Sequence, residues 1–510
     1  MFGTDRKDLA TELETMLDMA KTLFVQHVRE GQNADQAVVK YTSQNDLYKV
    51  IDFDLPNVGK GVDGTFELIK KTLDYSVNSW NPRFMDKLYA GTNPIGVISE
   101  MLIAVLNGNS HVYHVSPVFT LMEIQVTKAV GELLNMGENS GGLLCPGGSA
   151  SNLLAMFTAR NKLFPSITKT GYLPRPYPGA EYGPLKIFTS ISSHYSIDKA
   201  AQVMGLGTNS IIKVPTDSCG RMRVDRLEIL IRESVDRGET PFFVNATAGT
   251  TVLGAFDPIR AIATVAKQFN CWLHVDGSWG GSVVFSNSAV KTTNWLDGSG
   301  LADTFTLNPH KLLGVPLQCS MLLTPHKAHA LFAQANSLAA DYLFHGNPYD
   351  LGAGTIGCGR RPDAVKMFLA WTFYGRQGFG NRVDRALGSA ADLTTMVRNR
   401  KDRGFILVKD PSPFLQVCFW YIPNHLSNHV LHWEAQGNYT ANVSLVTKML
   451  HLRLREIGEF LVDHAPLDSL PHFFRIVINS PTVSVERDLA GLLDAIEEAG
   501  KEIEWDRVFG

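Results

Sequence analysis

A regular alternation of short apolar runs with helical patterns, from about residue 140 to residue 276, constrains the fold of this chain more than any other feature. Strand, loop and helix in this repeated order are typical of an α/β fold with a mostly parallel, doubly wound sheet and helices on both faces. Ligands of such sheets bind at the carboxyl ends of the strands. The residues that follow each run are therefore the candidates for function. The runs are Gly142–Cys145, Leu185–Thr189, Ser210–Val214, Pro241–Asn245 and Cys271–Asp276.

Length and composition limit the remaining possibilities. The 510 residues exceed the roughly 250–300 at which a single core stops growing, so we expect more than one domain. The formal net charge of −3, from 47 basic and 50 acidic residues, gives no reason to expect nucleic acid or a membrane surface as a partner. The six cysteines are far apart and form no C-x-x-C pair, which favours neither disulfides nor a metal site and predicts a reducing, cytoplasmic location.

Three segments are predicted. Residues 1–92 form an N-terminal helical segment, residues 93–375 a large domain, and residues 376–510 a smaller C-terminal α/β domain with strands near 416–421 and 473–478. Pro165–Pro184 and Asp341–Pro348 are predicted to be surface loops. The N-terminal helix, from about residue 8 to residue 30, carries an apolar stripe that we expect to pack on a neighbouring part of the chain or on a second subunit. The stripe consists of Leu9, Leu13, Met16, Leu17, Ala20 and Phe24.

Two charged residues follow apolar runs of the predicted sheet. Asp276 ends one run, and a carboxylate there costs free energy unless something pairs with it. A protonated pyridine nitrogen would be a suitable partner, although an ordinary N-cap or loop aspartate has the same pattern. Lys311 stands 35 residues later, beside His310. It could lose its proton on burial and act as an amine nucleophile, but most lysines are solvated surface charges.

A glycine-rich turn, Cys145–Asn152, lies between a predicted strand and a predicted helix. Its glycines let main-chain N–H groups approach an anion, Ser149 and Ser151 add hydroxyl donors, and the helix N-terminus favours negative charge. An ordinary strand-to-helix turn with a polar cap is the alternative interpretation.

His194, Thr250 and Thr251 also follow predicted strands. His194 could stack on a flat ring and the threonines could donate to a ligand, or all three could be ordinary turn residues. Each signal is weak by itself. One ligand with a phosphate, an aromatic ring, a phenolic oxygen, a ring nitrogen and an aldehyde would use all of these groups together, and that ligand is pyridoxal phosphate.

The motifs, in their order along the chain, resemble those of the group II pyridoxal-phosphate-dependent decarboxylases, in the branch of glutamate, cysteine-sulfinate and aspartate decarboxylases. The resemblance extends from about Asn81 to about Ser480. It implies the aspartate aminotransferase-like fold of PLP-dependent transferases and a homodimer with its active site at the subunit interface. The motifs that carry it are Pro146–Asn152, Ser193–Ser196, Asn245–Thr251, Trp272–Asp276 and Asn308–Lys311.

The resemblance also implies roles for the candidate residues. Lys311 would form the Schiff base with the cofactor, and Asp276 would pair with the ring nitrogen. His194 would stack on the ring, and Thr251 would lie near the phenolic oxygen. The phosphate would be bound by Ala150, Ser151, Asn308 and His310.

For the substrate, the resemblance assigns Arg475 to a carboxylate and Tyr342, on a mobile loop, to the return of a proton. The Tyr342 loop could serve the partner subunit. Ser278 and Lys87 depart from the family pattern: Ser278 stands where alanine is usual and is expected to face the ring, and Lys87 stands where the animal enzymes have glutamine. Lys87 could add a positive charge for an acidic substrate or could point to solvent.

The predicted function is α-decarboxylation of an acidic L-amino acid: glutamate, aspartate or cysteine sulfinate. A non-acidic substrate, an aminotransferase or lyase reaction, and a catalytically silent regulator of the same fold are the alternatives.

Overall fold

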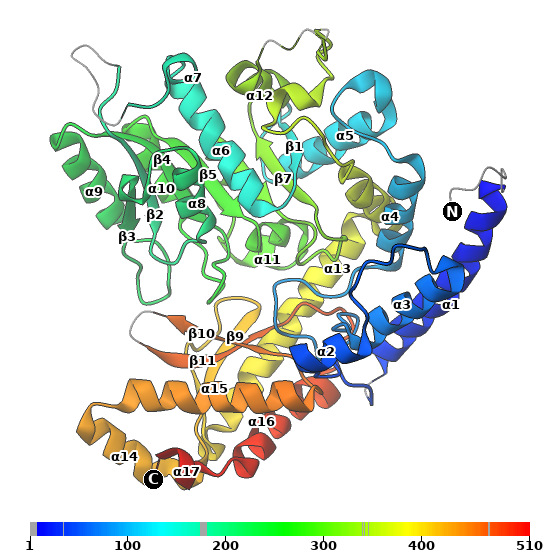
Figure 1. Cartoon of the computed structure of the whole chain (residues 1–510). Helices are drawn as coiled ribbons and strands as arrows, with labels where there is room; N and C mark the ends of the chain where they lie inside the picture. Colours follow the sequence, from blue (N-terminus) through cyan, green and yellow to red (C-terminus); the bar gives the residue numbers. More distant parts are fainter. Residues whose placement is uncertain are drawn as a thin grey trace. The chain divides into compact units, whose positions relative to one another are not determined.

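The computed structural model describes residues 8–33, 35–173, 181–338, 340, 342–344, 346–467 and 470–509. The chain divides into two compact units (Figure 1), unit 1 with Met1–Gly91, Gly388–Ser412 and Gln416–Gly510, and unit 2 with Thr92–Leu387 and Pro413–Leu415. The boundaries at residues 92 and 375 that we expected from the sequence stay a prediction. Of the two predicted loops, residues 174–180, 341 and 345 lie outside the described residues.

Unit 2 contains a seven-stranded sheet with the order β1-β7-β6-β5-β4-β2-β3. Pairing is parallel from β6 through β5, β4 and β2 to β3, whereas β7 runs antiparallel to both β6 and β1. The prediction of a mostly parallel sheet is therefore confirmed. The strands are β1 (Gly141–Cys145), β2 (Leu185–Ser190), β3 (Ile211–Val214), β4 (Thr240–Thr247), β5 (Trp272–Gly277), β6 (Thr304–Leu307) and β7 (Ser320–Thr324).

Helices cover this sheet on both faces. Every residue of β1, β5, β6 and β7 is buried, as expected for strands of a sheet that is covered on both faces. The buried residues include polar ones such as Thr304 and Thr306 of β6. Helix α6 packs on β1, β4, β5, β6 and β7, and α9 and α10 both pack on β4. The helices are α4 (Pro94–Leu106), α5 (Pro117–Leu133), α6 (Gly148–Leu163), α7 (Ile167–Thr170), α8 (Ser196–Val203), α9 (Val224–Asp236), α10 (Ile259–Gln268), α11 (Ala289–Thr292) and α12 (Ala328–Asn336).

The direction of β1 decides where the glycine-rich turn lies. Because β1 is antiparallel to β7 and β7 is antiparallel to β6, β1 runs in the same direction as the parallel strands. The carboxyl ends of β1, β2, β4, β5 and β6 therefore meet at one edge of the sheet, and the loops that follow them gather there.

Unit 1 contains a four-stranded antiparallel sheet with the order β10-β11-β9-β8. The predicted N-terminal helix is confirmed, and Leu9, Leu13, Leu17 and Phe24 of its apolar stripe are exposed. The strands are β8 (Phe405–Leu407), β9 (Gln416–Tyr421), β10 (Asp463–Leu467) and β11 (Leu470–Val477). The helices are α1 (Leu9–Gln32), α2 (Gln44–Val50), α3 (Gly61–Tyr75), α14 (Ser427–Gln436), α15 (Tyr439–Ile457), α16 (Ala490–Glu502) and α17 (Trp505–Phe509).

Helix α13 (Ala364–Asn399) contributes to both units. It leaves helical geometry at Gly375, where φ is 65°, a conformation that glycine adopts without strain. Shorter elements are the 3-10 helices Tyr113–Val115, Thr208–Ser210, Gly280–Phe285, Ser299–Leu301, Leu351–Gly354, Lys401–Arg403 and Asn424–Leu426, and the π-helix Val485–Leu489.

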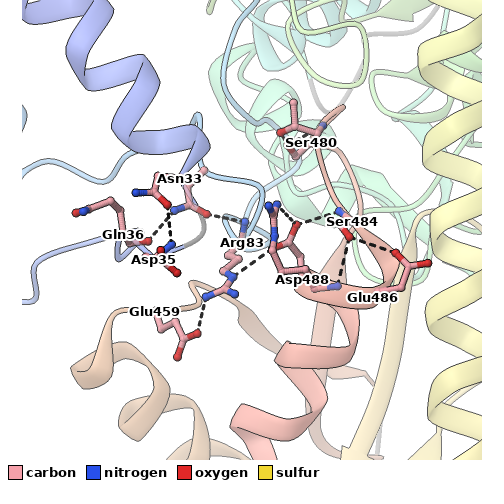
Figure 2. Close-up of polar contacts among 12 residues, drawn as sticks. Asn33, Asp35, Gln36, Arg83, Glu459, Ser480, Ser484, Glu486 and Asp488 are labelled. Atoms are coloured by element: carbon pink, nitrogen blue, oxygen red, sulfur yellow. Dashed lines mark hydrogen bonds and ion pairs between the residues drawn. The ribbon is translucent and has the colours of Figure 1, made fainter.

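A buried ionic cluster joins distant stretches of unit 1 (Figure 2). The guanidinium of Arg83 donates to Asp488 on the π-helix at 3.2 Å and also pairs with Glu459. Asp488 has no exposed side-chain surface, and it accepts a further hydrogen bond from the main-chain N–H of Ser484 at 2.9 Å. A carboxylate buried in this way is tolerated because cationic and N–H donors surround it.

Candidate active site

A cavity of about 330 Å³ lies at the carboxyl edge of the unit 2 sheet. Its size is within the range of pockets that hold cofactors and small molecules. It brings together most of the residues that the sequence predicted to share one ligand. Its lining residues include Gly147, Gly148, Ser149, Asn152, His194, Thr251, Asp276, Ser278, Asn308, His310, Lys311 and Gln318.

Asp276 is the buried anion of the cavity, with 5% of its surface exposed. Its Oδ2 accepts a hydrogen bond from the Asn152 amide at 2.8 Å, and its Oδ1 accepts one from the Ser278 N–H at 3.0 Å. Burial by itself raises the pKa of this carboxyl. The hydrogen bond from Ser278 and the positive charge of Lys311 outweigh burial and bring the pKa below its ordinary value. Asp276 is therefore ionised at neutral pH, and its charge favours a cationic ligand group.

Asn152 donates a hydrogen bond that holds the Asp276 carboxylate in place. This role was not predicted from the sequence. The Asn152 amide nitrogen also donates to Ser196 Oγ at 2.9 Å, and its Oδ1 lies 3.0 Å from His274 Nε2. Burial lowers the pKa of His274 to about 4, so the ring is neutral and does not add a charge beside Asp276. The motif Ser-Ala-Ser-Asn contains Asn152, but in the sequence this residue is indistinguishable from a polar residue of the first helical turn.

Lys311 is the amine of the cavity and follows β6. Burial lowers the pKa of its ammonium below the ordinary value, and the negative charge of Asp276 opposes this shift only in part. A lysine in such surroundings loses its proton more readily than one in water, which is the requirement for an amine nucleophile.

The glycine-rich turn closes the cavity beside this lysine. Gly147 has φ of 92°, a region that other residues rarely adopt. A Cβ at Gly148 would lie 2.7 Å from Asn308 Nδ2 and 2.7 Å from Ser278 Oγ. Gly147 is therefore favoured by its main-chain conformation, and a side chain at Gly148 would displace Asn308 or Ser278. Helix α6 begins at the cavity.

The three residues that follow Gly148 differ in position. Ser149 lines the cavity, whereas Ala150 and Ser151 are not among the described residues that line it. The N–H groups of Ala150 and Ser151 both donate to Gly147 O at 3.1 Å. The Ser151 hydroxyl is buried and lies 2.7 Å from Ser320 Oγ. It therefore forms a hydrogen bond in the core and does not face the cavity. Phosphate binding by Ala150 and Ser151 stays a prediction.

Two histidines present their rings to the cavity, and both are neutral. His194 Nδ1 accepts a hydrogen bond from the Ser196 N–H at 3.3 Å, and burial lowers the pKa of its ring. His310 Nδ1 lies 2.6 Å from Cys319 O and 3.1 Å from Cys319 N. Burial lowers the pKa of His310 to about 4.

Tyr342 does not lie in this group. Its surface is 88% exposed, and it is not among the described residues that line the cavity.

Lys87 and Arg475 lie together in unit 1 around a carboxylate that the sequence prediction missed. Asp463 Oδ2 is 2.9 Å from Lys87 Nζ and 2.8 Å from Arg475 Nη2. Lys87 Nζ is also 2.8 Å from Asp86 Oδ1, and its side chain is 50% exposed. Lys87 is therefore ion-paired rather than directed only to solvent.

Comparison with known proteins decides the family. The family model described as "Pyridoxal-dependent decarboxylase conserved domain" matches residues 45–422. The chain belongs to this family. The decarboxylase is 39% identical to L-aspartate decarboxylase dtxS4 of Metarhizium robertsii over 97% of this chain and 98% of that protein. It is 36% identical to cysteine sulfinic acid decarboxylase of Rattus norvegicus over 93% of this chain and 94% of the other.

Further comparisons agree on the family and on the fold. Glutamate decarboxylase of Drosophila melanogaster is 36% identical over 94% of this chain and 92% of its own length. The crystal structure of mouse CSAD superposes with a TM-score of 0.89 at 34% identity and covers 97% of this chain and 99% of that one. The predicted fold of PLP-dependent transferases is thereby confirmed, and the cofactor of the decarboxylase is pyridoxal phosphate.

The cavity fits this cofactor by its own chemistry. It offers a buried carboxylate, a lysine of lowered pKa, a histidine of lowered pKa, and a turn in which a side chain at Gly148 would displace Asn308 or Ser278. Across the described residues, no group of three or more His, Cys, Asp or Glu could hold a metal ion. None of the helices in the described part of the chain is long and apolar enough to cross a membrane.

Proposed function

We propose that this decarboxylase removes the α-carboxylate of an acidic L-amino acid, and that its substrate is L-aspartate, which gives β-alanine. The observation that carries the proposal is the cavity in which Lys311, Asp276 and His194 meet. The three relatives described above are decarboxylases of acidic amino acids, and of these the aspartate decarboxylase shares most sequence with this chain.

We assign each residue of the cavity a separate role in binding the cofactor. Pyridoxal phosphate, when bound, supplies a carbonyl for amines and an electron-withdrawing ring. Lys311 would hold the cofactor through its amine, and Asp276 would keep the ring nitrogen protonated. His194 would stack on the ring, Thr251 would lie near its phenolic oxygen and Ser278 would face it. Ser149, Asn308 and His310, which line the cavity, would hold the phosphate, together with Ala150 and Ser151 of the same turn.

Substrate contacts come from other parts of the chain. Arg475 binds a substrate carboxylate, and Lys87 adds positive charge for an acidic side chain, with Asp463 between them. Tyr342 gives a proton to the α-carbon after carbon dioxide leaves. Positioning of the bond that breaks and stabilisation of charge are the main contributions of the protein.

A substrate panel tests the reaction. Purified protein with pyridoxal phosphate is assayed with L-aspartate, L-cysteine sulfinate, L-glutamate and an aromatic amino acid, and both carbon dioxide and the amine product are measured. We expect β-alanine in equal amount to carbon dioxide. A keto acid product would instead indicate an aminotransferase, and cofactor binding without turnover would indicate a silent regulator. Lys311→Ala is expected to abolish both turnover and the visible absorption of the bound cofactor.

The assembly we propose is a cytoplasmic homodimer in which Tyr342 serves the active site of the partner. Exposed apolar side chains on α1 and α4, among them Leu9, Leu13, Ile98 and Val105, provide surface for such an association. Mixing tests this idea. Lys311→Ala and Tyr342→Phe homodimers are each inactive, but after subunit exchange they should recover roughly a quarter of wild-type activity, because half of the dimers then have one intact site. No recovery would mean that Tyr342 acts within its own subunit.

A further inference from the structure

A buried lysine outside the cavity forms a hydrogen bond with the main chain of a residue that lines the cavity. Lys366 lies on α13, and its side chain has no exposed surface. Its Nζ is 2.7 Å from Gln318 O, 2.8 Å from Asp363 Oδ1 and 3.1 Å from Glu100 Oε1. An ammonium group has three N–H donors, so the acceptors around Lys366 match its donors in number.

The charges around Lys366 balance. Glu100 and Asp363 also pair with Arg361, so two cations and two carboxylates form one group. A buried ion pair is often no more stabilising than hydrophobic residues of the same volume. Stability alone therefore does not account for a lysine at this position, and its contact with Gln318 O is the contact that leads to the cavity.

That contact fixes one peptide group. The carbonyl of Gln318 and the N–H of Cys319 belong to the same planar peptide. The Gln318 carbonyl accepts from Lys366, and His310 Nδ1 lies 3.1 Å from Cys319 N and 2.6 Å from Cys319 O. When the Cys319 N–H donates to Nδ1, the proton of the neutral ring is on Nε2, and Nε2 is the ring nitrogen that can donate to a ligand. Both His310 and Gln318 line the cavity.

We propose that Lys366 is a positioning residue for the cofactor: it orients the Gln318–Cys319 peptide so that His310 presents Nε2 to the phosphate of pyridoxal phosphate. The inference rests on the proposed role of His310 in phosphate binding. Lys366 touches neither cofactor nor substrate, so its effect should be on cofactor affinity and not on the reaction of the loaded enzyme.

Titration of the apoprotein with pyridoxal phosphate, followed by visible absorption, tests this role in Lys366→Met, which keeps the length of the side chain and removes its donors. We expect the Kd to rise about tenfold, as for one lost buried hydrogen bond. At saturating cofactor, kcat and the KM for substrate should stay close to wild type. The matched control is Lys128→Met on α5, where the lysine is half-exposed and 3.9 Å from Glu132; its Kd should not change.

A double-mutant cycle with His310→Gln shows whether Lys366 acts through His310. If it does, the double variant binds the cofactor no more weakly than the weaker single variant. Additive losses, or a lowered melting temperature with unchanged Kd, would overturn the proposal. A His310→Gln variant with wild-type Kd would refute the role of His310 while the decarboxylase function stands. Lys366→Gln is a milder second variant, and failure of both Lys366 variants to fold would assign the lysine to the fold alone.

Discussion

Replacing Asn152 by aspartate would put a second carboxylate against Asp276 with almost no change of shape. The Asn152 amide nitrogen lies 2.8 Å from Asp276 Oδ2. At this separation, two negative charges repel by about 6 kcal/mol at an effective dielectric constant of about 20, which corresponds to about 4 pKa units. The pair should therefore bind one proton at neutral pH instead of carrying two charges.

The consequence is a new pH dependence. In the wild-type enzyme the pKa of Asp276 is below its ordinary value, so this group stays ionised from about pH 6 to 9 and adds no step to the profile. In Asn152→Asp, the two carboxylates share one proton, so Asp276 carries only part of its negative charge. As pH rises through the raised pKa, Asp276 regains its full charge, and both cofactor affinity and kcat should increase.

The assay is the Kd for pyridoxal phosphate and the kcat, both measured across this pH range. Asn152→Ala is the control: it removes the hydrogen bonds without adding charge, so it should weaken cofactor binding about tenfold and give no new ionisation. A flat profile and a wild-type Kd for Asn152→Asp would show that Asn152 does not hold Asp276 as the structure indicates.

Three shorter predictions follow from the geometry. Gly148→Ala would bring a Cβ within 2.7 Å of Ser278 Oγ and should weaken pyridoxal phosphate binding by about 1–3 kcal/mol. An unchanged Kd in the cofactor titration would show that this turn does not contact the cofactor. Lys87→Met should raise the KM for L-aspartate about tenfold and leave the Kd for pyridoxal phosphate unchanged. Lys49→Met, which removes an exposed lysine, is the control. An unchanged KM in Lys87→Met would show that Lys87 only forms its ion pairs and does not contact substrate. Asp488→Ala removes one of the two carboxylates that pair with Arg83 and leaves Glu459. It should lower the free energy of unfolding by about 1–3 kcal/mol, measured by urea denaturation. A loss well below about 1 kcal/mol would show that Asp488 is dispensable.

The sheet was predictable because helices cover both of its faces. Burial on both sides makes Phe242–Val244 of β4 a continuous apolar run that is visible in the sequence. The antiparallel direction of β7 has no such signature, because a buried strand has the same composition in either direction.

The site was predictable where function needs a residue directly after a strand. Asp276, Lys311 and the glycine-rich turn each have a local signal: a charge after an apolar run, or glycines before a helix. Asn152 and Lys366 have none. Asn152 meets Asp276 across 124 residues and Lys366 meets Gln318 across 48, and only the folded chain defines these contacts.

Unit 1 is built from segments near both ends of the described chain, and this has a consequence during synthesis. Unit 2 is nearly continuous in the chain, so all but residues 413–415 of it has been translated once residue 387 is complete. Unit 1 needs Arg83 and Asp488, which are 405 residues apart. At roughly 5–20 residues per second, the N-terminal segment waits on the order of 20–80 s on the ribosome for its ionic partner. During this interval Val38 and Phe84, which are buried in the complete unit, lack their partners Gly458 and Leu461. Apolar side chains exposed in this way make the nascent N-terminal segment a client for chaperones.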